Sequence, residues 1–466
     1  MEKNQKLRSA VRKILLEKYI TEDKKAVSEI VMDIVVKDSN KNDIWAIKQA
    51  LAANNFKMYI VGGAVRDAVK NAIKIGKNPM DTTIDVPKDF DLATDAFPDQ
   101  IKAIFQNAPF ISNILNIGES FAIQFLVTKS NNRYELATFR SDEGGGRKPD
   151  SVKFETSPEE DSKRRDLTIN ALFYDIEEIT ENGFSGKVID YVGGVEDIKN
   201  NVVNTVGDPR ERFSEDPLRK IRTIRFAAKM GSSIPQNVAD AILDGNTSLI
   251  DRTNKIISNE RIRDEFYKGI KSSKSVVNFL NLLNSFNFFK HIFADLKISL
   301  NSFIEEKHPL ILLANLLKNN DLKSIQRNLF IKKYSTHEIN AISFLISLLN
   351  LNENTASAIK KFYLQKAKNS KSKINEKIYP VTDNVIYKFA DLNNIDKNKV
   401  KNLLRLANEF VQPSDLLKSI GYIDRDLGIA IDKLEKEFYK NPDNVKKIID
   451  SGDLDKIKEI IFMQKS

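Results

Sequence analysis

Two glycines and two acids, close together in the sequence, are the residues best suited to chemistry. Gly62 and Gly63 follow an apolar run and open a helical pattern, and Asp89 and Asp91 come after them, two residues apart. Glycine lets the backbone approach a phosphate closely, and the N–H groups at the start of a helix favour anions. On a strand, alternate residues share a face, so both carboxylates are expected to point the same way, as ligands of Mg²⁺. This combination indicates a nucleoside triphosphate held on metal ions, and therefore nucleotidyl transfer.

A third carboxylate, Glu135, is a candidate partner for the two aspartates. It lies in an alternating run, 133–139, that predicts a strand. A site that places two metal ions across the attacking and leaving oxygens has use for a third acid. Two interpretations stay open: Glu135 as a catalytic acid, or as a surface acid on an edge strand. The Asp-x-Asp pair also occurs in solvated turns, but the glycine turn upstream favours the metal site.

The segment 163–172 contains side chains that could bind sugars and phosphates. Arg165 can form two parallel hydrogen bonds to phosphate oxygens. If the segment is helical, Asp166 and Asn170 lie four residues apart on one face, where they could bind a ribose hydroxyl. The alternative is the capped, charged start of an ordinary helix.

A further polar block, 212–226, leads into a helix that is predicted at 218–230 and could select a base. Asp216 can cap it, and Arg219, Arg222 and Arg225 recur every three residues. An acceptor beside a guanidinium can bond the Watson–Crick edge of a base, and cytosine and adenine each present an amino donor beside a ring nitrogen. One Asp/Arg pair could therefore serve both bases. The alternative is a cationic helix face in a network of salt bridges.

A small α+β unit is needed to position these residues. Apolar or alternating runs predict strands at 57–61, 90–93, 120–128 and 133–139. Helices are expected after Gly63 and Pro98, and a breaker-rich loop spans 141–149. Residues 1–50 have helical periodicity, and strand patterns end near residue 205, after which helices are expected.

Composition narrows the class of protein. Apolar residues make up 41% and charged residues 29% of the chain, as in soluble globular proteins, and no apolar run is long enough to span a membrane. The absence of cysteine excludes disulfides and thiolate-bound zinc, which agrees with a cytoplasmic location. The three histidines are too scattered for a metal centre, so any metal is expected on carboxylates. A net charge of +9 favours a polyanionic partner, and nucleic acid fits better than a membrane surface.

Four ordered motifs within 57–270 resemble the class II RNA nucleotidyltransferases, which include bacterial-type CCA-adding tRNA nucleotidyltransferases and bacterial poly(A) polymerases. The motifs are Gly-Gly-x-Val-Arg-Asp from Gly62, Asp-x-Asp-Leu-Ala-Thr from Asp89, Arg-Arg-Asp-x-Thr-x-Asn-Ala from Arg164 and Glu-Asp-x-x-Arg from Glu215. In this order they are far more specific than any one of them alone.

The resemblance implies an α+β fold, with a small mixed-sheet nucleotidyltransferase head followed by an all-helical neck, body and tail. Catalysis is expected in the head. The expected parts are an N-terminal helical extension at 1–50, the catalytic head at 51–204, a neck with the nucleotide-selecting helix at 205–272, and an RNA-binding body and tail at 273–466.

The resemblance also implies residue roles. Asp89 and Asp91 would hold Mg²⁺, with two ions expected, and Asp216 with Arg219 would template the base. The expected catalytic residues are Asp89, Asp91 and Glu135. The expected nucleotide-binding residues are Gly62, Gly63, Arg66, Arg165, Asp166, Asn170, Asp216, Arg219, Arg222 and Arg225.

The activity expected on this basis is template-independent addition of CCA to the 3′ end of tRNA from CTP and ATP, with release of pyrophosphate. A poly(A) polymerase is the first alternative. Segment 118–123 contains neither the motif common in CCA-adding enzymes nor the one common in poly(A) polymerases, so it does not decide between the two activities. More distant alternatives are a small-molecule nucleotidyltransferase and an inactive RNA-binding protein. The basic stretch 360–368 could contact the tRNA backbone or form a solvated helix.

Overall fold

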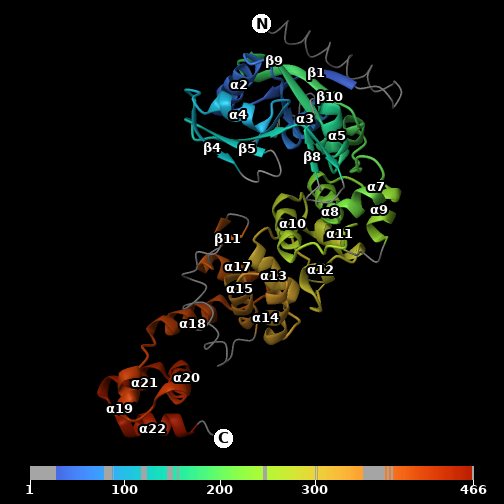
Figure 1. The fold of residues 1–466 in the computed structure, drawn as a ribbon. Coiled ribbons are helices and arrows are strands. Elements are labelled where there is room, and N and C mark those ends of the chain that lie inside the picture. The colour runs from blue at the N-terminus through green and yellow to red at the C-terminus, as the bar shows by residue number, and fades with distance from the viewer. Residues whose placement is uncertain are drawn as a thin grey trace. The chain divides into compact units, whose positions relative to one another are not determined.

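The structure is a computed structural model that describes most of the chain. The described residues are 28–77, 87, 89–116, 123–143, 151–154, 157–244, 249–299, 301, 303–349, 373–374, 377–378 and 381–463. The chain divides into two compact units, Met1–Ile257 and Ser258–Ser466 (Figure 1). The first unit contains a large sheet and all the candidate site residues, so it positions the chemistry.

An eight-stranded mixed sheet forms the centre of the first unit, in the order β1-β10-β9-β2-β3-β6-β5-β4. Neighbouring strands are antiparallel except β3 and β6, which are parallel. The strands are β1 (Ser28–Val35), β2 (Met58–Val61), β3 (Asp91–Thr94), β4 (Ile111–Asn116), β5 (Ile123–Thr128), β6 (Arg133–Thr138), β9 (Phe173–Thr180) and β10 (Gly183–Asp190). A separate antiparallel hairpin joins β7 (Arg140–Glu143) to β8 (Ser151–Phe154).

The burial of the strands distinguishes the two faces of the sheet. All four residues of β2 are buried, as expected for a central strand with the sequence Met-Tyr-Ile-Val. In β5 and β6, buried residues alternate with residues that are only half-buried or exposed. One face of this half of the sheet is therefore less covered, and it is the face to which Glu135 belongs.

Helices surround this sheet and follow it in the chain. They are α2 (Asp38–Ala52), α3 (Gly63–Lys77), α4 (Pro98–Phe105), α5 (Pro158–Lys163), α6 (Gly194–Lys199), α7 (Pro209–Glu215), α8 (Leu218–Met230) and α9 (Gln236–Leu243). Helix α8 is mostly buried and ends at Gly231, whose φ of 68° is the left-handed conformation that glycine adopts at helix ends.

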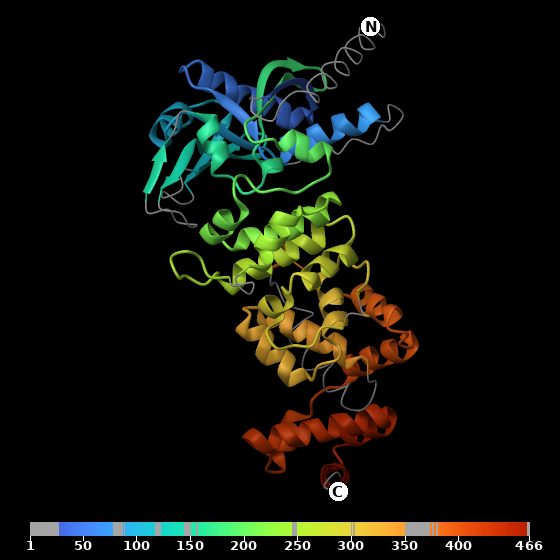
Figure 2. The same cartoon turned by 90° about the vertical axis from the view of Figure 1, so that its right-hand side faces the viewer.

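The second unit is largely helical (Figure 2). Its described helices are α10 (Asn259–Ser272), α11 (Val276–Ser285), α12 (Phe289–Phe293), α13 (Pro309–Leu317), α14 (Leu322–Ile331), α15 (Thr336–Ser347), α17 (Asp383–Leu392), α18 (Lys397–Glu409), α19 (Ser414–Ser419), α20 (Asp424–Lys440), α21 (Pro442–Ser451) and α22 (Leu454–Met463). Two short strands, β11 (Lys373–Ile374) and β12 (Lys377–Ile378), pair with each other. A hydrophobic cluster that includes Phe410, Leu434 and Ile457 gives the last helices a core of their own. Across the described residues, the structure contains no helix with the length and apolar character needed to cross a bilayer.

The structure confirms the α+β fold and most of the expected elements, and it corrects the N-terminal part. The predicted helices after Gly63 and Pro98 are α3 and α4. The helix predicted across residues 28–35 is wrong, because this segment is strand β1 and pairs along its whole length with β10. Ile30 and Ile34 fit both a helical and an alternating pattern, and the alternating burial of β1 shows which one holds. Residues 1–27 lie outside the described part.

Two other expectations need correction. Residues 141–143 of the predicted loop belong to strand β7, and its other residues lie outside the described part. Segment 163–172 is not one helix, because α5 ends at Lys163 and only a short 3-10 turn, Thr168–Asn170, follows. The division into neck, body and tail remains a prediction, and the segments 118–122 and 360–368 lie outside the described residues.

Candidate active site

Three carboxylates lie near the start of strand β3. The parallel register of β3 and β6 pairs Asp91 with Glu135, so their side chains lie on the same face of the sheet. Asp89 lies two residues before β3 begins, rather than on the strand as predicted. It is nevertheless close enough to Asp91 for their charges to interact. Asp91 thus interacts through its charge with both of the other acids proposed from the sequence.

Burial and repulsion from neighbouring carboxylates raise the pKa of Asp91 and Glu135. Loss of surrounding water raises the pKa of Asp91, although part of its side chain stays exposed; Asp89 raises it further and Arg165 lowers it. Burial likewise raises the pKa of Glu135, the charge of Asp91 adds to the rise, and Arg165 opposes it. Carboxylates that repel one another gain from a bound cation.

These residues fit a divalent metal ion. Among the residues described by the structure, no three His, Cys, Asp or Glu side chains are already grouped closely enough to enclose a metal. Mg²⁺, however, commonly binds through one or two carboxylates and completes its shell with water and phosphate oxygens. Asp89 and Asp91 are exposed oxygen donors with a raised pKa at Asp91, which is a donor set of this kind.

The glycine turn lies against these acids. Gly62 has a φ of 70°, which favours glycine, and a Cβ built on it would lie 3.8 Å from each of three atoms: Asp91 Oδ2, Arg165 Nη1 and the Asn170 carbonyl oxygen. Helix α3 begins at the next residue, Gly63. The start of a helix is therefore beside the carboxylates, where its N–H groups favour a phosphate.

Arg165 is held in place by an acid that sequence reasoning missed. The Arg165 Nε and Nη2 atoms donate to Asp161 Oδ2 at 3.0 and 2.9 Å, and Nη1 donates to the Asn170 carbonyl at 3.4 Å. The guanidinium also lies 5.1 Å from the centre of the Phe173 ring. The available signal was the spacing, since Asp161 precedes Arg165 by four residues at the end of a short helix.

Arg66 lies beneath the glycine turn and is enclosed by protein. Only 2% of it is exposed; Nε donates to Asp67 Oδ1 at 2.9 Å and Nη1 to Asn170 Oδ1 at 2.5 Å. The guanidinium also lies 5.2 Å from the Phe226 ring of α8. Arg66 therefore supports Asn170 and links α3 to α8, and its contact with a triphosphate remains a prediction.

Asp166 is paired with the helix that carries the arginines. Its Oδ2 accepts hydrogen bonds from Arg222 Nε at 2.7 Å and pairs with Nη2 at 2.6 Å, and its Oδ1 accepts one from the Leu167 N–H. Burial tends to raise the pKa of Asp166, but the charge and hydrogen bonds of Arg222 hold it below the ordinary value. Because Asp166 and Asn170 do not share a helix, the structure places them with different partners, Arg222 and Arg66.

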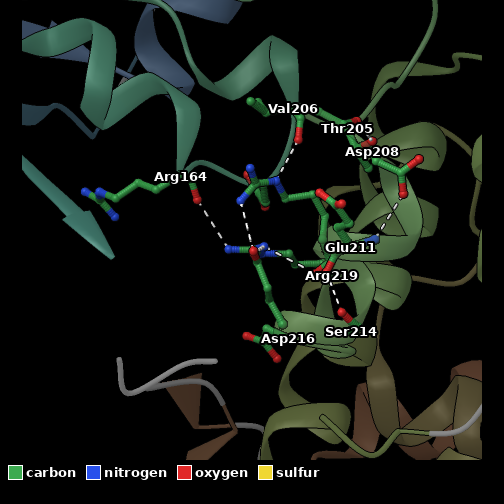
Figure 3. A network of polar contacts seen from close by, with 12 residues as sticks. Arg164, Thr205, Val206, Asp208, Glu211, Ser214, Asp216 and Arg219 are labelled. Carbon is green, nitrogen blue, oxygen red and sulfur yellow. Dashed lines mark hydrogen bonds and ion pairs between the residues drawn. The ribbon is translucent and has the colours of Figure 1, made fainter. Parts of the chain in front are cut away.

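Helix α8 presents Asp216 and Arg219 at its start. Asp216 Oδ1 accepts a hydrogen bond from the Leu218 N–H at 3.2 Å, but the predicted cap is wrong in position, because Pro217 is the residue that directly precedes the helix. Arg219 Nη1 donates to Glu215 Oε2 at 2.5 Å and to the Arg212 carbonyl, and Nη2 donates to the Arg164 carbonyl at 3.3 Å (Figure 3). The guanidinium of Arg219 is thus anchored from both α7 and the end of α5.

The last arginine of the row is buried. Arg225 is 8% exposed, and its guanidinium lies 4.2 Å from the centre of the Phe226 ring. Arg66 approaches the same ring, so Phe226 contacts guanidinium groups from two helices. Direct contact of Arg222 and Arg225 with a nucleotide remains a prediction.

Comparison with known proteins finds similarity to one family in the part of the chain that contains the three acids. Residues 58–204 match the family described as the poly(A) polymerase head domain. Proteins named CCA-adding enzyme are similar to part of the chain: that of Lactobacillus helveticus is 36% identical over 48% of this chain and 48% of its own, and that of Bacillus subtilis is 38% identical over 47% of each. The matched part is thus about half the length of these curated relatives.

Solved structures extend the likeness in fold to more of the chain. The CCA-adding enzyme of Bacillus stearothermophilus, in complex with CTP, covers 86% of this chain and 93% of its own with a TM-score of 0.58 and 22% identity. That of Thermotoga maritima, complexed with tRNA, covers 87% of this chain and 94% of its own with a TM-score of 0.51 and 19% identity. The family match thus covers the part of the chain that contains Gly62, Asp91, Glu135 and Arg165, and the solved structures are similar to this chain in fold.

Proposed function

We propose that this protein adds the nucleotides of CCA, C and A residues, to the 3′ end of tRNA, using CTP and ATP and releasing pyrophosphate. The observation that carries the proposal is the meeting of Asp91, Glu135 and Arg165 beside Gly62, at the start of α3. Such a site can hold the two charged parts of a nucleotidyl transfer, a cation on the acids and a triphosphate at the helix start. Curated relatives that match about half of the chain are named CCA-adding enzymes.

In the proposed reaction, the 3′-hydroxyl oxygen of the RNA forms a bond to the α-phosphorus of the nucleotide. The bond between that phosphorus and the bridging oxygen breaks, and its electrons leave with pyrophosphate. Bound Mg²⁺, with two ions expected, would supply charge stabilisation for the hydroxyl and the triphosphate. Asp89 and Asp91 would hold this metal, and Glu135 would complete the acidic face beside Asp91.

The remaining residues would bind and orient the nucleotide. Arg165 lies beside Gly62 and the acids, where its guanidinium can bond phosphate oxygens. Gly62 and Gly63 leave room for the triphosphate, and Asp216 with Arg219 would present an acceptor and donors to the base. Asp166, Asn170, Arg66, Arg222 and Arg225 would complete the nucleotide site, either by direct contact or through the hydrogen bonds described above.

We further propose that the helical unit binds the tRNA acceptor. The chain carries a net charge of +9, which favours a polyanion, and the fold of this unit resembles that of proteins solved with tRNA. A helical neck at 205–272 and a body and tail at 273–466 agree with this role. Residues 28–35 belong instead with the head, because they pair with β10.

A poly(A) polymerase is the second candidate, because the matching family is described by that head domain. It would use the same acids and arginines and differ in the choice of base and in the length of the product. Three tRNA transcripts, ending before CCA, after C and after CC, distinguish the two when tested with CTP, ATP or both. Extension that stops at CCA supports the proposal, whereas long ATP-dependent tails on an unstructured RNA contradict it.

A further inference from the structure

Asp161 binds two consecutive arginines at once. Its Oδ2 accepts from Arg165, and its Oδ1 accepts from Arg164 Nε at 2.8 Å and Nη2 at 2.6 Å. Only 1% of Asp161 is exposed, so this carboxylate is an interior charge neutralised by two guanidinium groups. Burial tends to raise the pKa of Asp161, but the two arginines hold it below the ordinary value, so it remains ionised at neutral pH.

The two arginines bound to Asp161 contact different parts of the site. Arg165 reaches the phosphate side of the site, at Gly62, Asp91 and Glu135. The carbonyl of Arg164 accepts a hydrogen bond from Arg219 Nη2 on the base-selecting helix, as the dashed line in Figure 3 shows. The Arg164 side chain also donates to the Arg140 carbonyl, which fixes its peptide from the β7 strand.

We propose that Asp161 is a positioning residue that sets the triphosphate-binding arginine and the base-reading arginine together, by fixing Arg165 through its side chain and Arg219 through the carbonyl of Arg164. This inference rests on the proposed function, since it assigns Arg165 to the phosphates and Arg219 to the base. It adds that one buried carboxylate serves both halves of the nucleotide site.

Charge and geometry explain why this position needs an aspartate. An asparagine has the same size, but it offers one acceptor oxygen and no charge, so one guanidinium loses its partner. A glutamate keeps the charge on a longer side chain, so both arginines can stay paired while their position shifts. Small displacements of orienting groups reduce the efficiency of nucleotide use, by up to about a hundredfold for a shift near 1 Å.

The test measures nucleotide binding without RNA, so that it does not depend on the identity of the acceptor. Calorimetric titrations with Mg²⁺ give the affinity for CTP, ATP, UTP and GTP, and inorganic tripolyphosphate reports on the phosphate side alone. For Asp161→Asn we expect about tenfold weaker binding of tripolyphosphate and a loss of most of the preference for CTP and ATP over UTP and GTP. Asp161→Glu should restore part of both.

Asp43→Asn is a matched control. Asp43 is also a buried aspartate of the first unit, 6% exposed, and it accepts from Thr128, Asn132 and Tyr134 on β5, β6 and the turn between them. Its substitution should lower stability without changing either binding readout. If Asp161→Asn behaves in the same way, Asp161 is only a structural residue and the inference is wrong.

A second variant keeps the inference testable if Asp161→Asn fails to fold. Arg164→Met removes the side chain that ties the Arg164 peptide to Asp161 and Arg140, but leaves both hydrogen bonds between Arg165 and Asp161. We expect it to reduce base preference several-fold while tripolyphosphate binding changes less than twofold. Equal loss of both, or of neither, contradicts the coupling.

Failure of the proposed function gives a different result. If the wild-type protein prefers CTP and ATP but extends no tRNA, the RNA acceptor was misassigned and the Asp161 inference can still be measured. If the wild-type protein binds all four nucleotides equally, the assignment of Arg219 to the base is wrong and the inference falls with it.

Discussion

Two groups of acidic residues in the first unit have opposite electrostatic surroundings. Burial and neighbouring acids raise the pKa of Asp91 and Glu135 on strands β3 and β6. Burial also acts to raise the pKa of Asp161 and Asp166, but arginines hold their pKa below the ordinary value. The first group has more negative charge than its protein surroundings balance, whereas the second is neutralised within the protein. The difference indicates that Asp91 and Glu135 are the acids that await a cation, meaning that a bound cation would balance their charge, whereas Asp161 and Asp166 hold arginines in place.

The largest expected effect is on the acids that await a cation. Asp89→Ala should reduce nucleotidyl transfer by about a thousandfold or more, because it removes a proposed metal ligand without filling its place. Binding of tRNA should change little, since the substitution is confined to the strand end of the head. Single-turnover extension of a tRNA transcript measures the first, and a filter-binding titration the second. Near-normal turnover would show that Asp89 holds no essential metal.

Folding stability should depend more on the acids that bind arginines than on the acids of the proposed metal site. Asp161→Asn should lower the free energy of unfolding of the first unit by about 3 kcal/mol, because it leaves guanidinium charge without its buried partner. Asp91→Asn should not lower it, since the folded protein raises the pKa of Asp91 and gains nothing from its charge. Trp45, the one tryptophan of the chain, lies in α2, so its fluorescence reports unfolding of the first unit in urea.

Equal losses of stability in the two variants would remove the distinction between the groups. Asp43→Asn serves as a reference for a buried aspartate that hydroxyl and amide groups hold in place of arginine. We expect its loss to be smaller than that of Asp161→Asn, because neutral donors bind a carboxylate less strongly than guanidinium does.

The sequence could identify the acids that await a cation better than the acids that hold arginines. Asp89 and Asp91 stand in a local pattern with a glycine turn, and helix α8 has the predicted bounds Leu218–Met230. Asp161 has no such pattern, because its role depends on two arginines whose directions are set only when α5 ends against β7 and α8. Local spacing predicts which residues are near in the chain, but not which partner each guanidinium takes.

Strand pairing was also beyond local patterns. Glu135 had two possible interpretations in the sequence, and only the parallel register of β3 and β6 places it beside Asp91. Strand β1 was mistaken for a helix because Ile30 and Ile34 satisfy both periods, and its pairing with β10 is a contact between residues far apart in the sequence. In both places tertiary contacts determine the structure, and local sequence patterns do not show them.

A smaller effect is expected where an arginine of the site is exchanged. Arg219→Ala should reduce the preference for CTP and ATP over UTP and GTP by about tenfold, because it removes the proposed donors to the base, while metal binding stays unchanged. Competition between correct and incorrect nucleotides in single-turnover extension measures it. Arg210→Ala is the matched control, since Arg210 lies on neighbouring helix α7 and pairs with Asp244 on the surface. Unchanged selectivity in Arg219→Ala would contradict the base-reading role.

The smallest expected effect is a pH dependence of opposite sign in the two groups. The folded state lowers the pKa of Asp161, so its stabilisation is complete above the unfolded value near 3.8 and is lost as the pH falls through the folded pKa. The folded state raises the pKa of Glu135 above 4.5, so it binds a proton more readily than the unfolded chain. Glu135 therefore costs stability as the pH rises from about 4.5 through its folded pKa.

Urea unfolding of the wild type, Asp161→Asn and Glu135→Gln between pH 3 and pH 7, followed by Trp45 fluorescence, separates the two contributions. The stability lost in Asp161→Asn should shrink at the acid end, because the wild type loses the same charge there by protonation. Glu135→Gln should gain on the wild type as the pH rises, because it lacks the carboxylate that the fold disfavours. If both differences changed with pH in the same direction, the two groups would not differ in charge balance, and the assignment of Glu135 to a cation-seeking face would lose its electrostatic basis.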